Sequence, residues 1–204
     1  MADISAKDVK DLRERTGAGI MDCKSALAEA EGDMDRAIEL LRVKGQASAA
    51  KRSGKDTSEG LVVSYIHATG TVGVLVEIQC ETDFVARSDD FRDFADEVAI
   101  HIAGAPSTPA YVSADEITES DREAERRVFT EKATEEGKPD DIVAKVVDGQ
   151  LNKWAKDVAL LEQEHIRTDR HEGKSIEELR AAISAKTGEN VRIARFAHFR
   201  VGGE

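Results

Sequence analysis

The sequence predicts an α+β protein in which a bundle of three helices precedes a core of three strands and several helices. Three observations support this fold class. Residues 1–53 carry apolar side chains at helical spacing, interrupted by glycines. Residues 61–80 and 191–201 alternate apolar residues with others, as strands with one buried face do. Polar, glycine-bearing residues 54–60 read as a linker, so we expect domains at 1–53 and 61–204.

The first domain is predicted to contain three short helices. Ser5 and Asp8 resemble a capping box at the start of the first helix, and Gly17 and Gly19 follow its end. Gly32 then separates the second helix from the third. A bundle of this size has little stability of its own, and its core is poor in aromatic residues.

A β-hairpin is predicted at residues 61–80, with its turn at Ala68-Thr69-Gly70. An isolated hairpin is only marginally stable, so the strand-like segment 191–201 is expected to complete the sheet. Its alternation slips once between Ile193 and Phe199, which allows a bulge or burial on both faces.

A short corner follows the hairpin and leads into an amphipathic helix. It places the carboxylate of Asp83 beside the large aromatic ring of Phe84. One interpretation is that Phe84 fills the local core and Asp83 is a turn residue. The other is that the pair is presented at the surface for function, and the local pattern alone favours the first.

Helices are also predicted between the hairpin and the last strand. Residues 114–137 are densely charged, and we expect a largely solvent-facing helix there that starts at about Ser120 and is ended by Gly137. Pro139 fits the first turn of the next helix, whose apolar stripe includes Trp154. Ser175 and Glu178 form a capping box for a last helix.

The composition indicates a soluble globular protein, with 40% hydrophobic and 34% charged residues. No apolar run is long enough to cross a bilayer, and the first five residues lack the basic and apolar regions of a signal peptide. With only Cys23 and Cys80, we expect no disulfide framework and a cytoplasmic location. The net charge of −12 falls on residues 54–204, so nucleic acid is not an expected partner.

Few residues in this sequence are candidates for catalysis or for metal binding. The five histidines, at positions 67, 101, 165, 171 and 198, lie at no spacing that marks a metal site, and Glu162-x-x-His165 is best explained by chance. Cys23 is either a reactive thiol or a small packing residue, and packing is favoured. The sequence contains no nucleophile elbow, Walker loop or dinucleotide fingerprint. We therefore expect binding surfaces rather than an enzyme, and no cofactor.

Several segments resemble bacterial elongation factor Ts, in the order in which that family has them. They are residues 9–24, 82–87, 160–163, 195–196 and 201–202. This family is the guanine nucleotide exchange factor for elongation factor Tu. The resemblance implies a ubiquitin-associated-like three-helix domain at the N-terminus and a core with an antiparallel sheet.

The resemblance also implies a use for the corner. The first domain would grip the nucleotide-binding domain of elongation factor Tu, and Phe84 would enter the partner as an apolar wedge. Asp83, with Thr82 and Val85, would disturb the magnesium and phosphate site. Magnesium bridges protein oxygens and nucleotide phosphates, so its displacement weakens GDP binding. GDP release and GTP rebinding would then proceed without covalent chemistry.

Six further residues fall on the partner-binding surface by the same resemblance: Arg13, Ile20, Met21, Lys51, Arg52 and His101. For three of them a structural alternative is open. Met21 could belong to the core, Arg13 to an ordinary solvated face, and His101 to a packed helix.

The chain also departs from the longer members of the family, which duplicate the core and carry an inserted helical hairpin and a final helix. We expect this 204-residue chain to lack these parts and to have a single core, with a homodimer as one way to replace them. Two other functions are open. One is an adaptor that binds through residues 1–53 without affecting a nucleotide, and the other is a thiol enzyme centred on Cys23.

Overall fold

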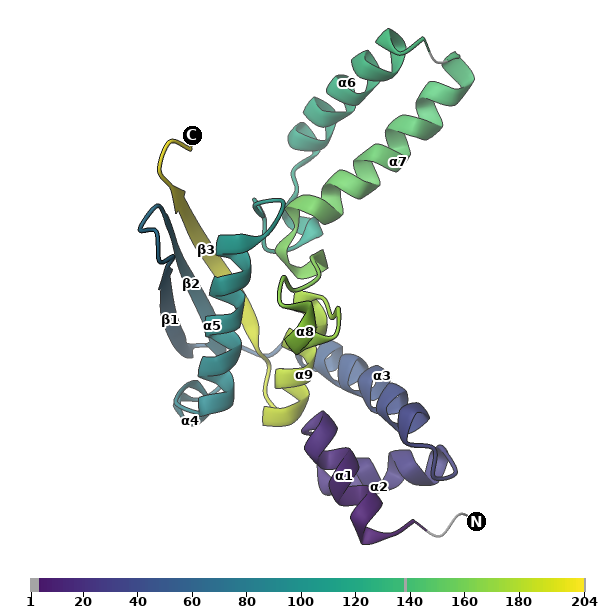
Figure 1. Cartoon of the computed structure of the whole chain (residues 1–204), viewed down its shortest axis with the longest axis vertical. Coiled ribbons are helices and arrows are strands. Elements are labelled where there is room, and N and C mark those ends of the chain that lie inside the picture. Colours follow the sequence, from purple (N-terminus) through teal and green to yellow (C-terminus); the bar gives the residue numbers. More distant parts are fainter. Residues whose placement is uncertain (1–3, 138, 204) are drawn as a thin grey trace. The chain divides into compact units, whose positions relative to one another are not determined.

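The structure, a computed structural model, describes residues 4–137 and 139–203, so residues 1–3, 138 and 204 of the two predicted domains lie outside the described residues. It confirms the α+β class and the three-stranded antiparallel sheet, whose strand order is β1-β2-β3 (Figure 1). Two compact units interleave along the chain. One comprises residues 4–62, 77–95 and 178–193, and the other comprises 63–76, 96–177 and 194–203. The predicted domain boundaries stay a prediction.

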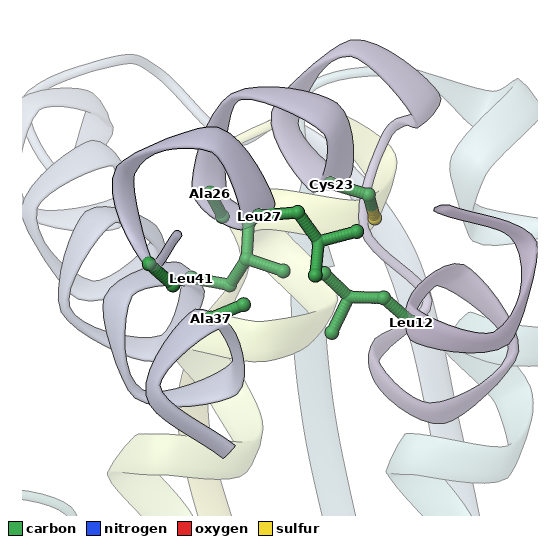
Figure 2. Packing of buried hydrophobic residues seen from close by; sticks show 7 residues of the cluster. Leu12, Cys23, Ala26, Leu27, Ala37 and Leu41 are labelled. Atoms are coloured by element: carbon green, nitrogen blue, oxygen red, sulfur yellow. The ribbon is translucent and has the colours of Figure 1, made fainter. Parts of the chain in front are cut away.

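Three helices form the N-terminal bundle: α1 (Ala6–Thr16), α2 (Ile20–Glu29) and α3 (Met34–Arg52). The predicted capping box is present at Ser5 and Asp8, and Gly17 ends α1 with a positive φ of 67°. Leu12, Cys23, Ala26, Leu27, Ala37 and Leu41 make the core of the bundle (Figure 2). The sulfur of Cys23 is buried among leucines and alanines, as its packing interpretation predicts.

The sheet consists of β1 (Glu59–Ile66), β2 (Val72–Cys80) and β3 (Arg192–Arg200). Alternate residues of β2 are buried, namely Val74, Val76, Ile78 and Cys80. Strand β1 begins two residues before the predicted start, within the predicted linker. Gly60 has a φ of 152°, and a Cβ there would lie 2.1 Å from the carbonyl oxygen of Ile78, so this position needs glycine.

The corner after β2 is a short helix, α4 (Asp83–Ala86), followed by α5 (Asp89–Gly104). Later in the chain come the single turns η1 (Ala114–Glu116) and η2 (Leu160–Glu162) and the short helix α8 (Thr168–His171). The last helix, α9 (Ile176–Thr187), leads through Gly188 to β3. Among the described helices, none is both long and apolar enough to span a membrane.

Two long helices, α6 (Glu119–Glu135) and α7 (Asp140–Val158), form a helical hairpin (Figure 1). Thr118 caps α6 through the backbone N–H of Asp121, close to the predicted start at Ser120. Ala133, Val147 and Leu151 form the small core of the hairpin, and Trp154 packs against it. The expectation that the chain lacks a helical hairpin is therefore wrong. The charged segment 114–137 did predict one helix, but its spacing did not show that the two helices pair.

Candidate functional site

The corner at residues 82–85 presents one aromatic ring to solvent. Thr82 caps α4 by accepting a hydrogen bond from the backbone N–H of Val85, over 3.4 Å. Val85 is buried, with 6% of its surface exposed, whereas Phe84 is 83% exposed. A helix of four residues buries only one side, and here Val85 and Ala86 occupy it. The interpretation of Phe84 as a core residue therefore does not describe the structure.

Asp83 directly precedes Phe84 in the chain, and its carboxylate is also exposed. Its Oδ2 atom forms an ion pair with Nη2 of Arg87 at 3.0 Å, one helical turn away. Such an exposed pair contributes little, because water screens both charges. Asp83 can therefore leave Arg87 and interact with a binding partner at small cost.

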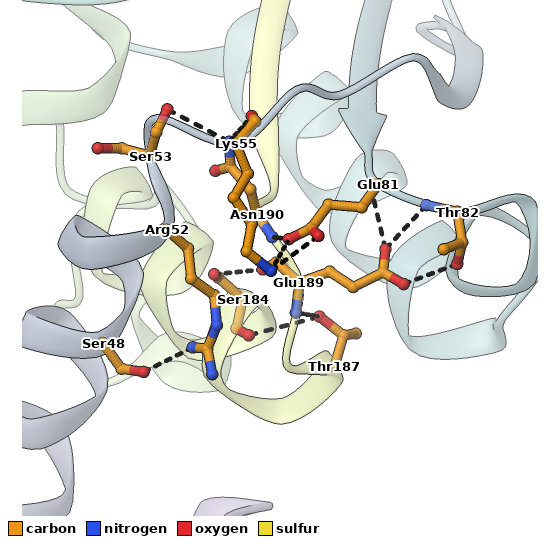
Figure 3. A network of polar contacts seen from close by, with 10 residues as sticks. All are labelled: Ser48, Arg52, Ser53, Lys55, Glu81, Thr82, Ser184, Thr187, Glu189 and Asn190. Carbon is orange, nitrogen blue, oxygen red and sulfur yellow. Dashed lines mark hydrogen bonds and ion pairs between the residues drawn. The ribbon is translucent and has the colours of Figure 1, made fainter.

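A polar network anchors the base of the corner to the segment between α9 and β3 (Figure 3). The carboxylate of Glu189 accepts hydrogen bonds from Thr82, and the carboxylate of Glu81 accepts one from the backbone N–H of Asn190. The Asn190 hydrogen bond, together with the hydrogen bond from Lys55, holds the pKa of Glu81 below its usual value. No local sequence pattern indicates this network, because it joins residues more than 100 positions apart.

The residues predicted to bind a partner in the N-terminal bundle are mostly at its surface. Ile20 and Met21 are 56% and 75% exposed at the start of α2, and Arg13 is exposed on α1. The interpretation of Met21 as a core residue is therefore not supported. Lys51 is exposed at the end of α3, while Arg52 is half-buried and donates a hydrogen bond to Oγ of Ser48.

His101 is different, because only 1% of its surface is exposed. Its Nδ1 atom accepts a hydrogen bond from the backbone N–H of Ile166, so Nε2 carries the proton and donates to Oε1 of Gln163 at 2.8 Å. Burial lowers the pKa of His101 to about 4. His101 is therefore a packed residue of helix α5, as the structural alternative proposed, and its hydrogen bond holds Gln163 in place.

A buried cluster centred on Glu97 was not predicted from the sequence. Its carboxylate accepts hydrogen bonds from the guanidinium groups of Arg167 and Arg170 and also lies within 3.0 Å of Nε2 of His171. Glu97 is 70 residues or more from these partners, so sequence spacing held no signal.

The ligating atoms of Glu97, His165 and His171 lie within 4.8 Å of one another, which raises the question of a metal ion. The residues do not fit one. Two guanidinium groups already neutralise the carboxylate, and both ring nitrogens of His165 are engaged by backbone groups of Glu97 and Arg167. The cluster is therefore better explained as an ion-paired part of the interior.

Both cysteines are buried. Burial raises the pKa of the Cys23 thiol, and it raises that of Cys80 to about 11. At neutral pH both sulfurs are therefore protonated and poorly nucleophilic. This argues against a thiol enzyme centred on Cys23.

The comparison with known proteins agrees with the segments singled out in the sequence. The family model described as Elongation factor TS matches residues 3–172. A protein named Elongation factor Ts from Thermoanaerobacter sp. is 49% identical over 199 residues, which is 98% of this chain and 95% of the relative. Proteins of the same name are 50% identical in Desulforamulus reducens, over 99% of this chain and 91% of the relative, and 48% identical in Nitratidesulfovibrio vulgaris, over 98% of each. The chain therefore belongs to the elongation factor Ts family of guanine nucleotide exchange factors, which act in protein synthesis.

Proposed function

We propose that this protein promotes GDP release and GTP rebinding on elongation factor Tu by disturbing the magnesium and phosphate site of that partner. The observation that carries this proposal is the exposed ring of Phe84 beside the exposed carboxylate of Asp83, on a corner whose base is fixed by hydrogen bonds. Because the side chain of Phe84 is 83% exposed, a partner that buried it would remove a large apolar area from water, which favours binding.

In the proposed mechanism Phe84 enters a slot between elements of the nucleotide-binding domain. Asp83 is carried with it and perturbs the groups that order the magnesium ion. The ion bridges the phosphates to the partner, so losing it weakens GDP binding. Binding is reciprocal, and GDP must therefore weaken the binding of this protein by the same factor. Incoming GTP then expels the exchange factor, and no covalent step is needed.

The first contact is proposed to come from the N-terminal bundle. Arg13, Ile20 and Met21 supply an exposed cation and two exposed apolar side chains, and Lys51 and Arg52 supply positive charge at the end of α3. Methionine and arginine are enriched in protein interfaces relative to the rest of the surface. His101 would contribute from beneath the surface, by holding Gln163.

A homodimer is proposed as the assembled form. Apolar side chains of Ile66, Leu75, Phe199 and Val201 are exposed around a hollow at the end of the sheet. A second copy that covered this surface would remove them from water. The measurement is the mass in solution by light scattering. Phe199→Glu should convert a dimer to a monomer, and a parental protein that is already monomeric rejects this part of the proposal.

The exchange function is tested by release of fluorescent GDP from purified elongation factor Tu, with and without this protein. We expect release to accelerate strongly at substoichiometric amounts, because an exchange factor turns over. Unchanged release rejects the proposal. Binding to elongation factor Tu without any effect on GDP would instead select the adaptor function of residues 1–53.

A further inference from the structure

Two carboxylates link the end of β2 to the segment before β3, because each accepts hydrogen bonds from the backbone of the other's segment (Figure 3). Oε2 of Glu189 accepts from the backbone N–H groups of Glu81 and Thr82, each over 3.1 Å. In return, Oε1 of Glu81 accepts from the backbone N–H of Asn190 over 2.6 Å. Each carboxylate thus fixes the backbone of the other's segment, and we refer to these four residues as the bracket.

The backbone of Glu189 is itself held by hydrogen bonds to residues of α9. Its carbonyl oxygen accepts a hydrogen bond from Oγ of Ser184, a fully buried residue of α9, over 2.5 Å. Its N–H donates to Oγ1 of Thr187 over 3.4 Å. Gly188, with a φ of 76°, turns the chain out of α9 immediately before it. The Glu189 carboxylate therefore extends from a rigid base toward Thr82.

The hydroxyl of Thr82 connects the bracket to the helix that carries Phe84. A threonine hydroxyl has one hydrogen to donate and lone pairs that accept. Thr82 donates its hydrogen to Oε1 of Glu189 over 2.6 Å, which leaves its lone pairs available to the N–H of Val85. Glu189 thus orients the cap of α4. A helix of four residues depends strongly on its cap, because it has few internal hydrogen bonds.

The bracket also holds the chain that leaves the N-terminal bundle. Nδ2 of Asn190 donates to the carbonyl oxygen of Lys55 over 2.9 Å, and to that of Ser53 over 3.4 Å. Nζ of Lys55 lies 2.9 Å from Oε2 of Glu81. The corner is therefore tied to two other stretches of chain, residues 53–55 and 189–190, and has little freedom at its base.

We infer that Glu189 is a positioning residue for nucleotide exchange, which holds residues 82–85 in one conformation so that Phe84 meets the partner already oriented. This inference rests on the proposed wedge function of Phe84. An exposed side chain on a free corner would lose conformational freedom on entering the partner, and that loss would slow the exchange step. Hydrogen bonds to a charged acceptor are strong enough to remove this freedom beforehand.

The test compares exchange kinetics of three Glu189 variants. Glu189→Ala deprives three donors of their acceptor, and the rate at saturating exchange factor should fall about tenfold or more, since misplacement of a working group is costly. Half-saturation should change by less than about threefold, because the bundle surface is intact. Glu189→Gln keeps the length and one accepting oxygen and should recover most of the rate, whereas the shorter Glu189→Asp should resemble alanine. A parental rate for Glu189→Ala overturns the inference.

The matched control is Asp148→Asn, which removes one partner of an exposed ion pair with Arg126 on the hairpin. It should exchange at the parental rate. If Glu189→Ala fails to unfold cooperatively, Thr82→Val replaces it, because this variant removes only the hydroxyl and leaves both backbone bonds. It should slow exchange about threefold or more, as loss of a cap that orients the working group predicts. A parental rate for a folded Thr82→Val overturns the inference equally.

A double variant separates this inference from the wedge proposal. If Glu189 acts through Phe84, Phe84→Ala with Glu189→Ala should be no slower than Phe84→Ala alone. If the two losses instead multiply, Glu189 acts by another route and the inference is wrong. If Phe84→Ala alone exchanges at the parental rate, the wedge itself fails. If only Phe84→Ala is slow, the wedge stands and the positioning role falls.

Discussion

Replacing Phe84 by alanine tests the wedge most directly, because we expect a small effect on folding and a large effect on exchange. The ring is 83% exposed, so its removal takes almost nothing from the core. The free energy of unfolding should change by less than about 0.5 kcal/mol, as for other surface positions. A change well above this value would mean that the ring also supports the corner.

The effect on exchange follows from the area that a partner would bury. Full burial of a phenylalanine side chain contributes about 1.5–3 kcal/mol. If this burial occurs only in the state that releases GDP, its loss lowers the exchange rate about tenfold to a hundredfold. The half-saturating concentration should change much less, because the bundle surface is untouched.

The assay is stopped-flow release of fluorescent GDP from elongation factor Tu over a range of exchange-factor concentrations. Val128→Ala is the matched control, since Val128 is also an exposed apolar residue but lies on the hairpin helix α6. Phe84→Leu should fall between the parent and alanine. A folded Phe84→Ala protein with the parental maximal rate would refute the wedge.

Three further predictions concern folding and are measured by urea unfolding. Gly60→Ala should destabilise the sheet by about 3 kcal/mol or more, because the new Cβ would lie 2.1 Å from the carbonyl oxygen of Ile78. Leu12→Ala should lower the stability of the bundle by about 2–5 kcal/mol, because Leu12 is fully buried in its core. Burial depresses the pKa of His101 from 6.5 to about 4, so the unfolded chain binds its proton first as the pH falls. Stability should therefore be full above pH 6.5 and decline between 6.5 and 4, by about 3 kcal/mol from this residue, with His165 contributing in the same direction. His101→Gln should flatten the decline.

Patterns with short-range causes were predictable from the sequence. The capping box at Ser5 and the glycine after α1 act within a few residues, and both are present. Alternation identified the buried face of β2, because each inward residue is apolar. The density of charge located α6 and helical spacing located α7, but their pairing depends on contacts between Ala133 and residues of the next helix, which no local period encodes.

The functional corner shows where such prediction stops. Phe84 and Val85 are neighbouring apolar residues, and the local pattern favours Phe84 as the buried one, whereas the structure buries Val85. The choice is made by Thr82, which fixes where α4 begins, and Thr82 is in turn oriented by a carboxylate 107 residues away. Moving the start of so short a helix by one residue would rotate a different side chain into the core. The exposure of Phe84 is therefore set by a long-range hydrogen bond, and the local hydrophobic pattern could not reveal it.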